Sequence, residues 1–127
     1  MAYTKAGLSP DGSSSYFLPR LVGLRRAQDL MFTNRTLSAP EALDWGLVTQ
    51  VVPADDLMSS ALELAENLGA GASGSNAAIK SLLLTSFENS LETQMELEGR
   101  MISACAASPD GREGITAFVE KRPPEFS

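Results

Sequence analysis

The tetrapeptide Ser-Pro-Asp-Gly occurs twice in this sequence, at residues 9–12 and at residues 108–111. Each copy carries an aspartate, Asp11 or Asp110, whose carboxylate could accept and return a proton. The chain contains no histidine, the side chain that most often acts as a general base near neutral pH. Proton transfer by this protein must therefore rest on carboxylates, tyrosine, lysine or Cys105.

Asp11 lies in a loop rich in glycine and serine, directly ahead of a predicted helix. A carboxylate in such a loop can approach a substrate closely, and partial burial there would bring its proton transfer toward neutral pH. The same residue types also form turns and helix N-caps, so a purely structural role for Asp11 is the alternative. Asp110 stands between two predicted amphipathic helices, where a structural cap is the expected role.

The composition is that of one soluble domain with a core, because 43% of the 127 residues are hydrophobic. The net charge of −6 argues against nonspecific binding to nucleic acids. One cysteine excludes an internal disulfide and provides too few thiolates for a structural zinc site, so we expect no metal and a reducing, cytoplasmic location. No apolar run is long enough to span a membrane, and the N-terminus lacks the pattern of a secretory signal.

Hydrophobic periodicity predicts a mainly helical chain with one or two short strands. The predicted helices cover residues 13–22, 24–32, 39–45, 57–68, 76–87, 91–107 and 112–122, with Pro19 kinking or interrupting the first. The predicted strands are residues 3–6, which end at Gly7, and residues 47–52, for which an extended edge is the alternative. An isolated strand leaves its backbone groups unpaired, so residues 3–6 would need a partner outside this chain or would not form a strand.

Several predicted helices begin after a residue whose side chain can accept hydrogen bonds from the first turn. The capping-box pairs are Ser38 with Glu41 and Asn89 with Glu92, and the single caps are Asp55 or Asp56 and Ser108 or Asp110. Gly69 is the expected end of the helix over residues 57–68, and residues 70–75 read as a turn rich in glycine and serine.

Three stretches occur here in an order that is typical of one protein family. They are GLSPDGSSSYFLPRLVG, FTNRTLSAPEALDWGLVTQVV and REGITAFVEKRPPEF. Together they resemble the crotonase family, the enoyl-CoA hydratase/isomerase group, and the match is to the C-terminal half of longer members. The resemblance implies an α/β crotonase-like (ClpP/crotonase) fold, in which residues 1–23 end the core spiral and hold the active-site loop. Residues 24–127 would form a helical region that carries trimer contacts and covers coenzyme A.

The resemblance favours an enoyl-CoA isomerase in which Asp11 is the acid and base. Hydratases of the family have a catalytic glutamate four residues before the glycine that is here Gly7, and that position is Tyr3. Some isomerases of the family, and the 4-chlorobenzoyl-CoA dehalogenases, instead have an aspartate at the position of Asp11. A dehalogenase-like hydrolase with Asp11 as nucleophile is therefore the alternative, and it would need a histidine from outside this chain.

The same resemblance places Tyr3, Pro10 and Gly12 at the substrate pocket. Tyr3 would hydrogen-bond Asp11 or line the acyl pocket, and a packed strand aromatic is the alternative. Phe118 and Lys121 match positions that reach the adenine and the phosphates of coenzyme A bound to a neighbouring subunit. The alternative for this pair is a core phenylalanine and a solvated lysine.

The partners that the resemblance implies are an acyl-CoA thioester and further copies of the same chain. Coenzyme A would be part of the substrate, and no separate cofactor is expected. The expected assembly is a trimer or hexamer, without nucleic acid or membrane. Family members have their oxyanion-hole donors in the half that this chain lacks, so we expect the chain alone to be inactive. A non-catalytic helical oligomerisation module is the other reading of the chain by itself.

Overall fold

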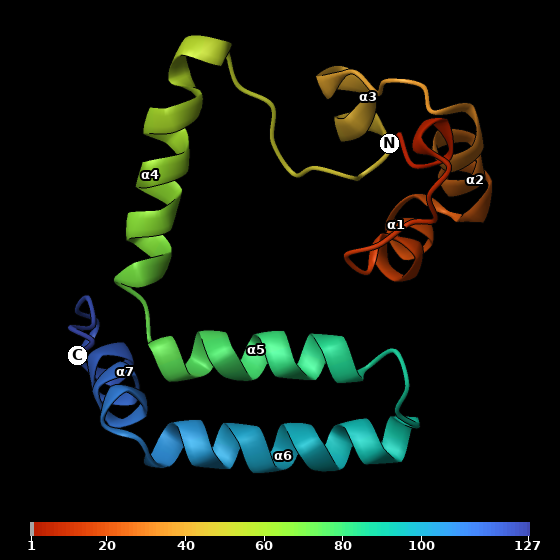
Figure 1. The fold of residues 1–127 in the computed structure, drawn as a ribbon. Helices are drawn as coiled ribbons and strands as arrows, with labels where there is room; N and C mark the ends of the chain where they lie inside the picture. Colours follow the sequence, from red (N-terminus) through yellow and green to blue (C-terminus); the bar gives the residue numbers. More distant parts are fainter. Residues whose placement is uncertain (1) are drawn as a thin grey trace. The chain divides into compact units, whose positions relative to one another are not determined.

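The computed structural model describes residues 2–127, which form helices joined by loops and no β-strand (Figure 1). The chain divides into two compact units, an N-terminal unit up to Leu57 and a C-terminal unit of residues 58–127. This boundary differs from the one between residues 23 and 24 that the family resemblance implies. Assignment of residues 1–23 to the core spiral, and of residues 24–127 to a trimerisation region that covers coenzyme A, stays a prediction.

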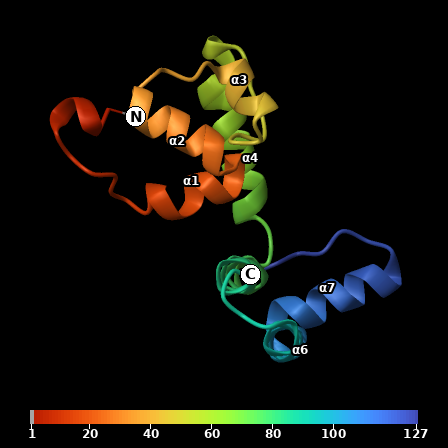
Figure 2. The same cartoon turned by 90° about the vertical axis from the view of Figure 1, so that its right-hand side faces the viewer.

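The N-terminal unit is built on α1 (Ser14–Val22) and α2 (Leu24–Thr33), which lie side by side (Figures 1 and 2). Gly23 joins them with a φ of 82°, a backbone conformation that few other residues adopt. The buried core consists of Leu18, Val22, Ala27 and Leu30. α1 continues through Pro19, so an interruption of the helix at that residue is wrong, and a kink there stays a prediction.

The two predicted strands are also wrong. Residues 3–6 lie in a turn that contains the 3-10 helix η1 (Thr4–Ala6), which ends at Gly7 with a φ of 68°. Local hydrogen bonds from the Ala6 and Leu8 amides to the Tyr3 carbonyl satisfy this segment, so it needs no partner strand. Residues 47–52 are an irregular connection after α3 (Ala39–Asp44), since the described residues provide no neighbouring strand for a ladder.

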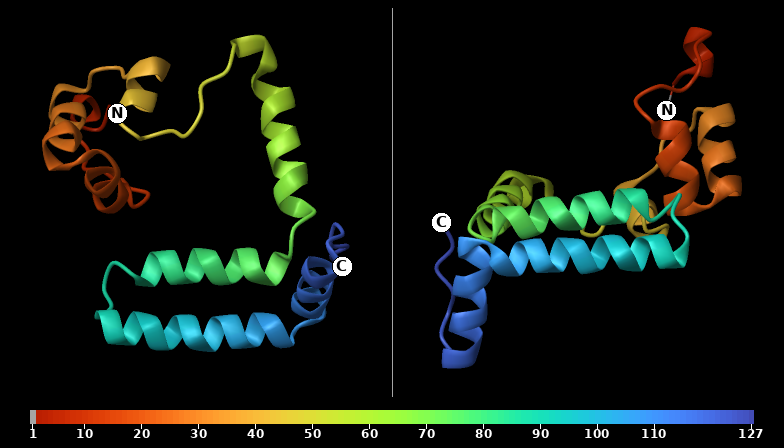
Figure 3. Two further views of the ribbon diagram at one scale, coloured as in Figure 1. Left: turned by 180° about the vertical axis from the view of Figure 1, so that it is seen from behind. Right: turned by 90° about the horizontal axis from the view of Figure 1, so that it is seen from below.

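The 3-10 helix η2 (Ala54–Asp56) leads directly into α4 (Leu57–Gly69), and the unit boundary falls after the first residue of α4. The C-terminal unit contains the rest of α4, then α5 (Ser73–Thr85), α6 (Leu91–Ala107) and α7 (Pro109–Glu120). α5 and α6 run antiparallel beside each other, and α7 packs on α6 (Figures 1 and 3). Within α4, α5 and α6 no residue is buried, whereas Ala117 of α7 is fully buried. These helices therefore present large apolar side chains such as Leu83 and Ile102, which are 64% and 71% exposed.

The helix caps follow the predictions in part. Ser38 accepts from the Glu41 amide at 3.4 Å, and Ser108 accepts from the Gly111 amide at 3.0 Å, as expected. Ser90, not Asn89, caps α6, because its hydroxyl accepts from the Thr93 amide at 3.2 Å. The predicted pair of Asn89 and Glu92 is therefore wrong: the Asn89 amide donates instead to Gln94 at 2.9 Å. α5 begins at Ser73, inside the segment that was read as a turn.

Candidate active-site loop

Residues 3–13 form the loop that carries the candidate catalytic aspartate. The Tyr3 hydroxyl donates a hydrogen bond to Asp11 Oδ1 at 2.8 Å. Tyr3 is half-buried and Asp11 is exposed, so the partial burial expected for Asp11 is not provided by the residues that the structure describes. The structure thus brings Tyr3 and Asp11 together in the first of the two roles predicted for Tyr3, and Pro10 and Gly12 flank the carboxylate along the chain.

The backbone around Asp11 is fixed by the first turn of α1. The Asp11 carbonyl accepts from the Ser14 amide at 3.0 Å and from the Ser14 hydroxyl at 2.7 Å. Gly12 and Ser13 both take positive φ, 57° and 62°, and Ser13 is the N-cap residue of α1. Asp11 is therefore not the N-cap of α1, and its carboxylate contacts Tyr3 instead of the helix.

Asp110, in the second copy of the tetrapeptide, is placed differently. Its Oδ1 accepts from the amide and from the hydroxyl of Ser127, both at 3.1 Å, and Ser108 caps the helix. Asp110 is half-buried in the first turn of α7 and ties the end of the chain to that helix. This arrangement fits the structural role that its surroundings predict.

Asn34 anchors the loop to the rest of the N-terminal unit. It ends α2 with a φ of 54°, and its side-chain amide donates to the Thr4 hydroxyl and to the Phe32 carbonyl. Since Thr4 follows Tyr3, this bond holds the start of the loop against the end of α2. The sequence reasoning missed this contact, although asparagine after a helix is a known signal for a left-handed C-cap.

A second cluster that sequence reasoning missed surrounds Arg35. Its Nε donates to Asp29 at 2.6 Å, and its terminal nitrogens donate to both oxygens of Glu41 at 3.1 and 2.9 Å. The guanidinium also lies 4.8 Å from the centre of the Trp45 ring. The hydrogen bonds from Arg35 hold the pKa of the Glu41 carboxyl below its usual range. The cluster fixes the connection between α2 and α3. The local spacing of these residues in the sequence does not predict the cluster.

Phe118 and Lys121 lie at the end of α7. Phe118 is 85% exposed, so it belongs to no core that these residues form by themselves. Lys121 is exposed, adopts a φ of 55°, and closes the helix with its amide bonded to the Phe118 carbonyl at 3.3 Å. Both side chains are therefore open to a ligand, although nothing in this geometry identifies one.

Ion pairs hold the C-terminal segment on α7. Arg122 donates to both oxygens of Glu113 at 2.6 and 2.9 Å and to Glu120 at 2.7 Å. The Glu125 amide adds a bond to Glu113 at 2.9 Å. Chiefly because of Arg122, the pKa of Glu113 falls to about 2. These bonds order the chain directly after Lys121.

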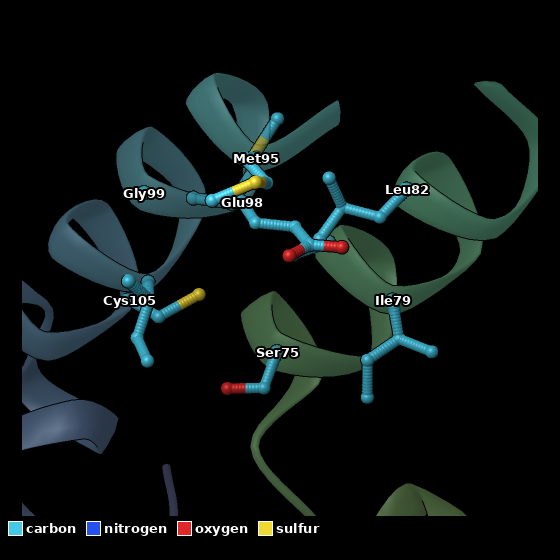
Figure 4. A pocket seen from close by; sticks show the side chains of 10 residues that line it. Ser75, Ile79, Leu82, Met95, Glu98, Gly99 and Cys105 are labelled. Atoms are coloured by element: carbon cyan, nitrogen blue, oxygen red, sulfur yellow. The ribbon is translucent and has the colours of Figure 1, made fainter. Parts of the chain in front are cut away.

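An open apolar groove of about 570 Å³ lies between α5 and α6 (Figure 4). Its lining residues are Ser75, Ala78, Ile79, Leu82, Met95, Glu98, Gly99, Met101, Ile102 and Cys105. Glu98 is the sole ionisable carboxylate in this lining, so the groove offers contact area rather than a set of converging catalytic groups. None of the residues predicted as sites from the sequence belongs to it.

Within residues 2–127, no cluster of three or more cysteine, aspartate and glutamate side chains has the geometry to hold a metal ion. The helices of this described part are all too short or too polar to cross a membrane.

Comparison with known proteins settles the family. The sequence profile described as enoyl-CoA hydratase/isomerase matches residues 1–127. The chain belongs to the enoyl-CoA hydratase/isomerase family. The 1,2-epoxyphenylacetyl-CoA isomerase of Escherichia coli K12 is 37% identical over 127 residues, which are 100% of this chain and 48% of that protein. A 4-chlorobenzoyl coenzyme A dehalogenase from Arthrobacter is 35% identical over 120 residues, which are 94% of this chain and 44% of that protein.

Solved structures of this enoyl-CoA hydratase/isomerase family share the fold. An enoyl-CoA hydratase from Polaromonas sp. JS666 superposes with a TM-score of 0.92 at 36% identity, over 100% of this chain and 49% of that one. An enoyl-CoA hydratase/isomerase from Cupriavidus metallidurans CH34 gives 0.89 at 40% identity, over 99% and 48%. The fold is therefore crotonase-like, and the chain spans about half the length of the relatives that it matches.

Proposed function

We propose that this chain is the C-terminal half of an acyl-CoA isomerase that moves a double bond within an enoyl-CoA thioester. The observation that carries the proposal is the Asp11 carboxylate, which is held by the Tyr3 hydroxyl at 2.8 Å and is not the N-cap of α1. Among its relatives is a 1,2-epoxyphenylacetyl-CoA isomerase, 37% identical over the whole chain, which supports isomerisation of a CoA thioester as the broader reaction type.

Asp11 would act as both base and acid in this reaction. Its carboxylate removes a proton from the carbon next to the shifting double bond, which leaves a dienolate with negative charge on the thioester oxygen. The same carboxyl then returns the proton to the other end of the conjugated system, so no external oxidant or second base is needed. Tyr3 occupies the position where hydratases of the family have a glutamate, and a phenol is a poor base for activating water.

Stabilisation of the dienolate would come from outside these residues. We propose that the backbone donors of the oxyanion hole belong to the other half of the protein. Loss of one such donor commonly costs about 3 kcal/mol of transition-state stabilisation, so residues 1–127 alone should not turn over substrate.

We further propose that Phe118 and Lys121 bind coenzyme A. An aromatic face suits the adenine ring, and an ammonium suits the phosphates. The support is that Phe118 is 85% exposed and Lys121 is exposed at the end of α7. The coenzyme would be the handle of the substrate and would take no part in electron transfer.

A homo-oligomer, trimer or hexamer, is the proposed assembly. The unburied apolar side chains of α4, α5 and α6 support it, because so much apolar surface favours association over a free monomer. Light scattering of the full-length protein tests the trimer or hexamer, and a monomer there would argue against it. Light scattering of the purified chain alone tests whether these residues associate by themselves as a helical oligomerisation module.

The second candidate function is hydrolytic dehalogenation, which the 35% identity to the Arthrobacter 4-chlorobenzoyl coenzyme A dehalogenase favours. Asp11 would attack the halogen-bearing aromatic carbon and displace halide to form an aryl ester, and water would then hydrolyse this ester at the aspartyl carbonyl, which releases a hydroxyaryl-CoA and regenerates the Asp11 carboxylate. That second step needs a base to activate water. This chain contains no histidine, so a histidine base would have to come from outside residues 1–127.

The decisive experiment replaces Asp11→Asn in the full-length protein and uses Asp110→Asn as the matched control from the same tetrapeptide. We expect D11N to lower kcat/KM for enoyl-CoA isomerisation by about 10²- to 10⁴-fold, the usual contribution of a general acid or base. D110N should stay near the wild-type value. Unchanged turnover in D11N would overturn the proposal, and halide release from a haloaryl-CoA without isomerisation would favour the second candidate.

A further inference from the structure

The bond between Tyr3 and Asp11 has a role beyond holding the loop together. We propose that Tyr3 is a positioning residue, which binds Asp11 Oδ1 so that Oδ2 is the oxygen that exchanges the substrate proton. This inference rests on the proposed function, because it assigns a geometry to the proton transfer by Asp11. The Tyr3 hydroxyl would contact the Asp11 carboxylate and not the substrate.

Both ends of the hydrogen bond between Tyr3 and Asp11 have a fixed backbone. The Tyr3 carbonyl accepts from the Ala6 amide at 3.0 Å and from the Leu8 amide at 2.9 Å, which closes the turn around η1. The Asp11 carbonyl accepts twice from Ser14, at 3.0 and 2.7 Å. The side-chain bond spans eight residues and so links two anchored points.

An exposed carboxylate can take more than one orientation unless a partner holds it. Asp11 is exposed, and an exposed aspartate samples several rotamers about its two side-chain torsions. A donor at 2.8 Å from Oδ1 selects one orientation of the carboxyl group and leaves Oδ2 to point away from the phenol. Proton transfer is sensitive to such orientation, because misplacement of a reacting group by about 1 Å can lower the rate by about 10²-fold.

The backbone next to Tyr3 is also held by α2 of the N-terminal unit. Asn34 at the end of α2 donates to the Thr4 hydroxyl, one residue after Tyr3. α2 contributes Ala27 and Leu30 to the buried core. The position of the phenol is therefore tied to the packed helices rather than to the exposed loop alone.

The test is a double-mutant cycle of Tyr3→Phe and Asp11→Asn in the full-length protein, with Tyr16→Phe as the matched control. Tyr16 is the other tyrosine of the chain and belongs to α1, so Y16F removes a phenol hydroxyl from a residue outside the loop of residues 3–13. We expect Y3F to lower kcat about 10-fold, to change KM for the enoyl-CoA less than about twofold, and to leave the melting temperature unchanged. In the D11N background, Y3F should have no further effect on kcat, because the group it orients is gone.

The outcomes separate the inference from the function on which it rests. If D11N is inactive but Y3F matches wild type and Y16F, the positioning role is wrong and the function of Asp11 stands. If Y3F lowers kcat equally in the D11N background, Tyr3 acts independently of Asp11, which also overturns the inference. Full activity of D11N removes the proposed function itself, whatever Y3F does.

Discussion

The chain turns sharply at Ser108, between the end of α6 and the start of α7, and we call this turn the α6–α7 corner. The substitution Gly111→Ala tests how closely the two helices approach there. Gly111 lies in the first turn of α7, and a Cβ added there would lie 1.9 Å from the Cys105 carbonyl oxygen and 2.9 Å from the Ala106 Cα. Both are backbone atoms of α6, so no flexible side chain can move aside. The two helices would have to separate, and Ser108, whose hydroxyl caps α7, lies within the same corner.

The expected loss follows from two opposing effects. Alanine is favoured over glycine in a helix by about 0.5–1 kcal/mol, which would stabilise the variant if space were available. Overpacking typically costs about 1–3 kcal/mol, and a backbone contact at 1.9 Å belongs at the upper end. We expect a net loss of about 2 kcal/mol, or roughly 8 °C in Tm for a domain of this size.

The assay is thermal unfolding of residues 1–127 followed by helical circular dichroism. Gly99→Ala is the matched control, since Gly99 lies within α6 and a Cβ there would meet no atom within 4 Å. This control should raise Tm by about 2–4 °C through helix propensity alone. A G111A variant as stable as G99A would refute the tight α6–α7 corner, and with it the direction that the structure gives to α7.

Three further predictions concern α7. Glu113→Gln should remove a stabilisation that is complete above the ordinary pKa of 4.5 and is lost as the pH falls to about 2, so Tm of wild type and variant should converge near pH 2. Ser108→Ala should lower Tm by roughly 4 °C, since loss of an N-cap costs about 1 kcal/mol; an unchanged Tm would exclude the cap. Lys121→Gly should relieve the left-handed strain and stabilise the chain by up to about 1 kcal/mol. In the full-length protein the same change should raise KM for acyl-CoA, and an unaltered KM would contradict a role in binding phosphate.

Helix positions were largely predictable because apolar periodicity and N-cap residues are local signals. Ser38 and Ser108 cap their helices as the sequence indicates, and Gly69 ends α4. The errors lie where several local solutions compete. Ser90 takes the cap that was assigned to Asn89, because adjacent residues of similar chemistry offer two possible starts for α6.

The repeated tetrapeptide shows why the candidate site could be predicted only in part. In residues 108–111 the serine caps a helix and the glycine fits a crowded corner. In residues 9–12 the glycine takes a φ of 57°, and Asp11 bonds to Tyr3 eight residues earlier. Identical letters therefore adopt different structures, because contacts outside the tetrapeptide decide between them. The left-handed C-cap at Asn34 has a local signal, but the contact of Asn34 with Thr4, 30 residues away, has none.

The exposed apolar side chains of α5 and α6 determine which substitutions these helices would tolerate. Side chains such as Leu83 and Ile102 touch too little of this polypeptide for their truncation to weaken its own fold appreciably. A deep mutational scan read out by folding of residues 1–127 should therefore accept polar replacements there. The same replacements should lower activity in a scan of the full-length protein that is read out by turnover of its acyl-CoA substrate. Positions that tolerate polar residues in the first scan but not in the second would mark the surface that other polypeptide must cover.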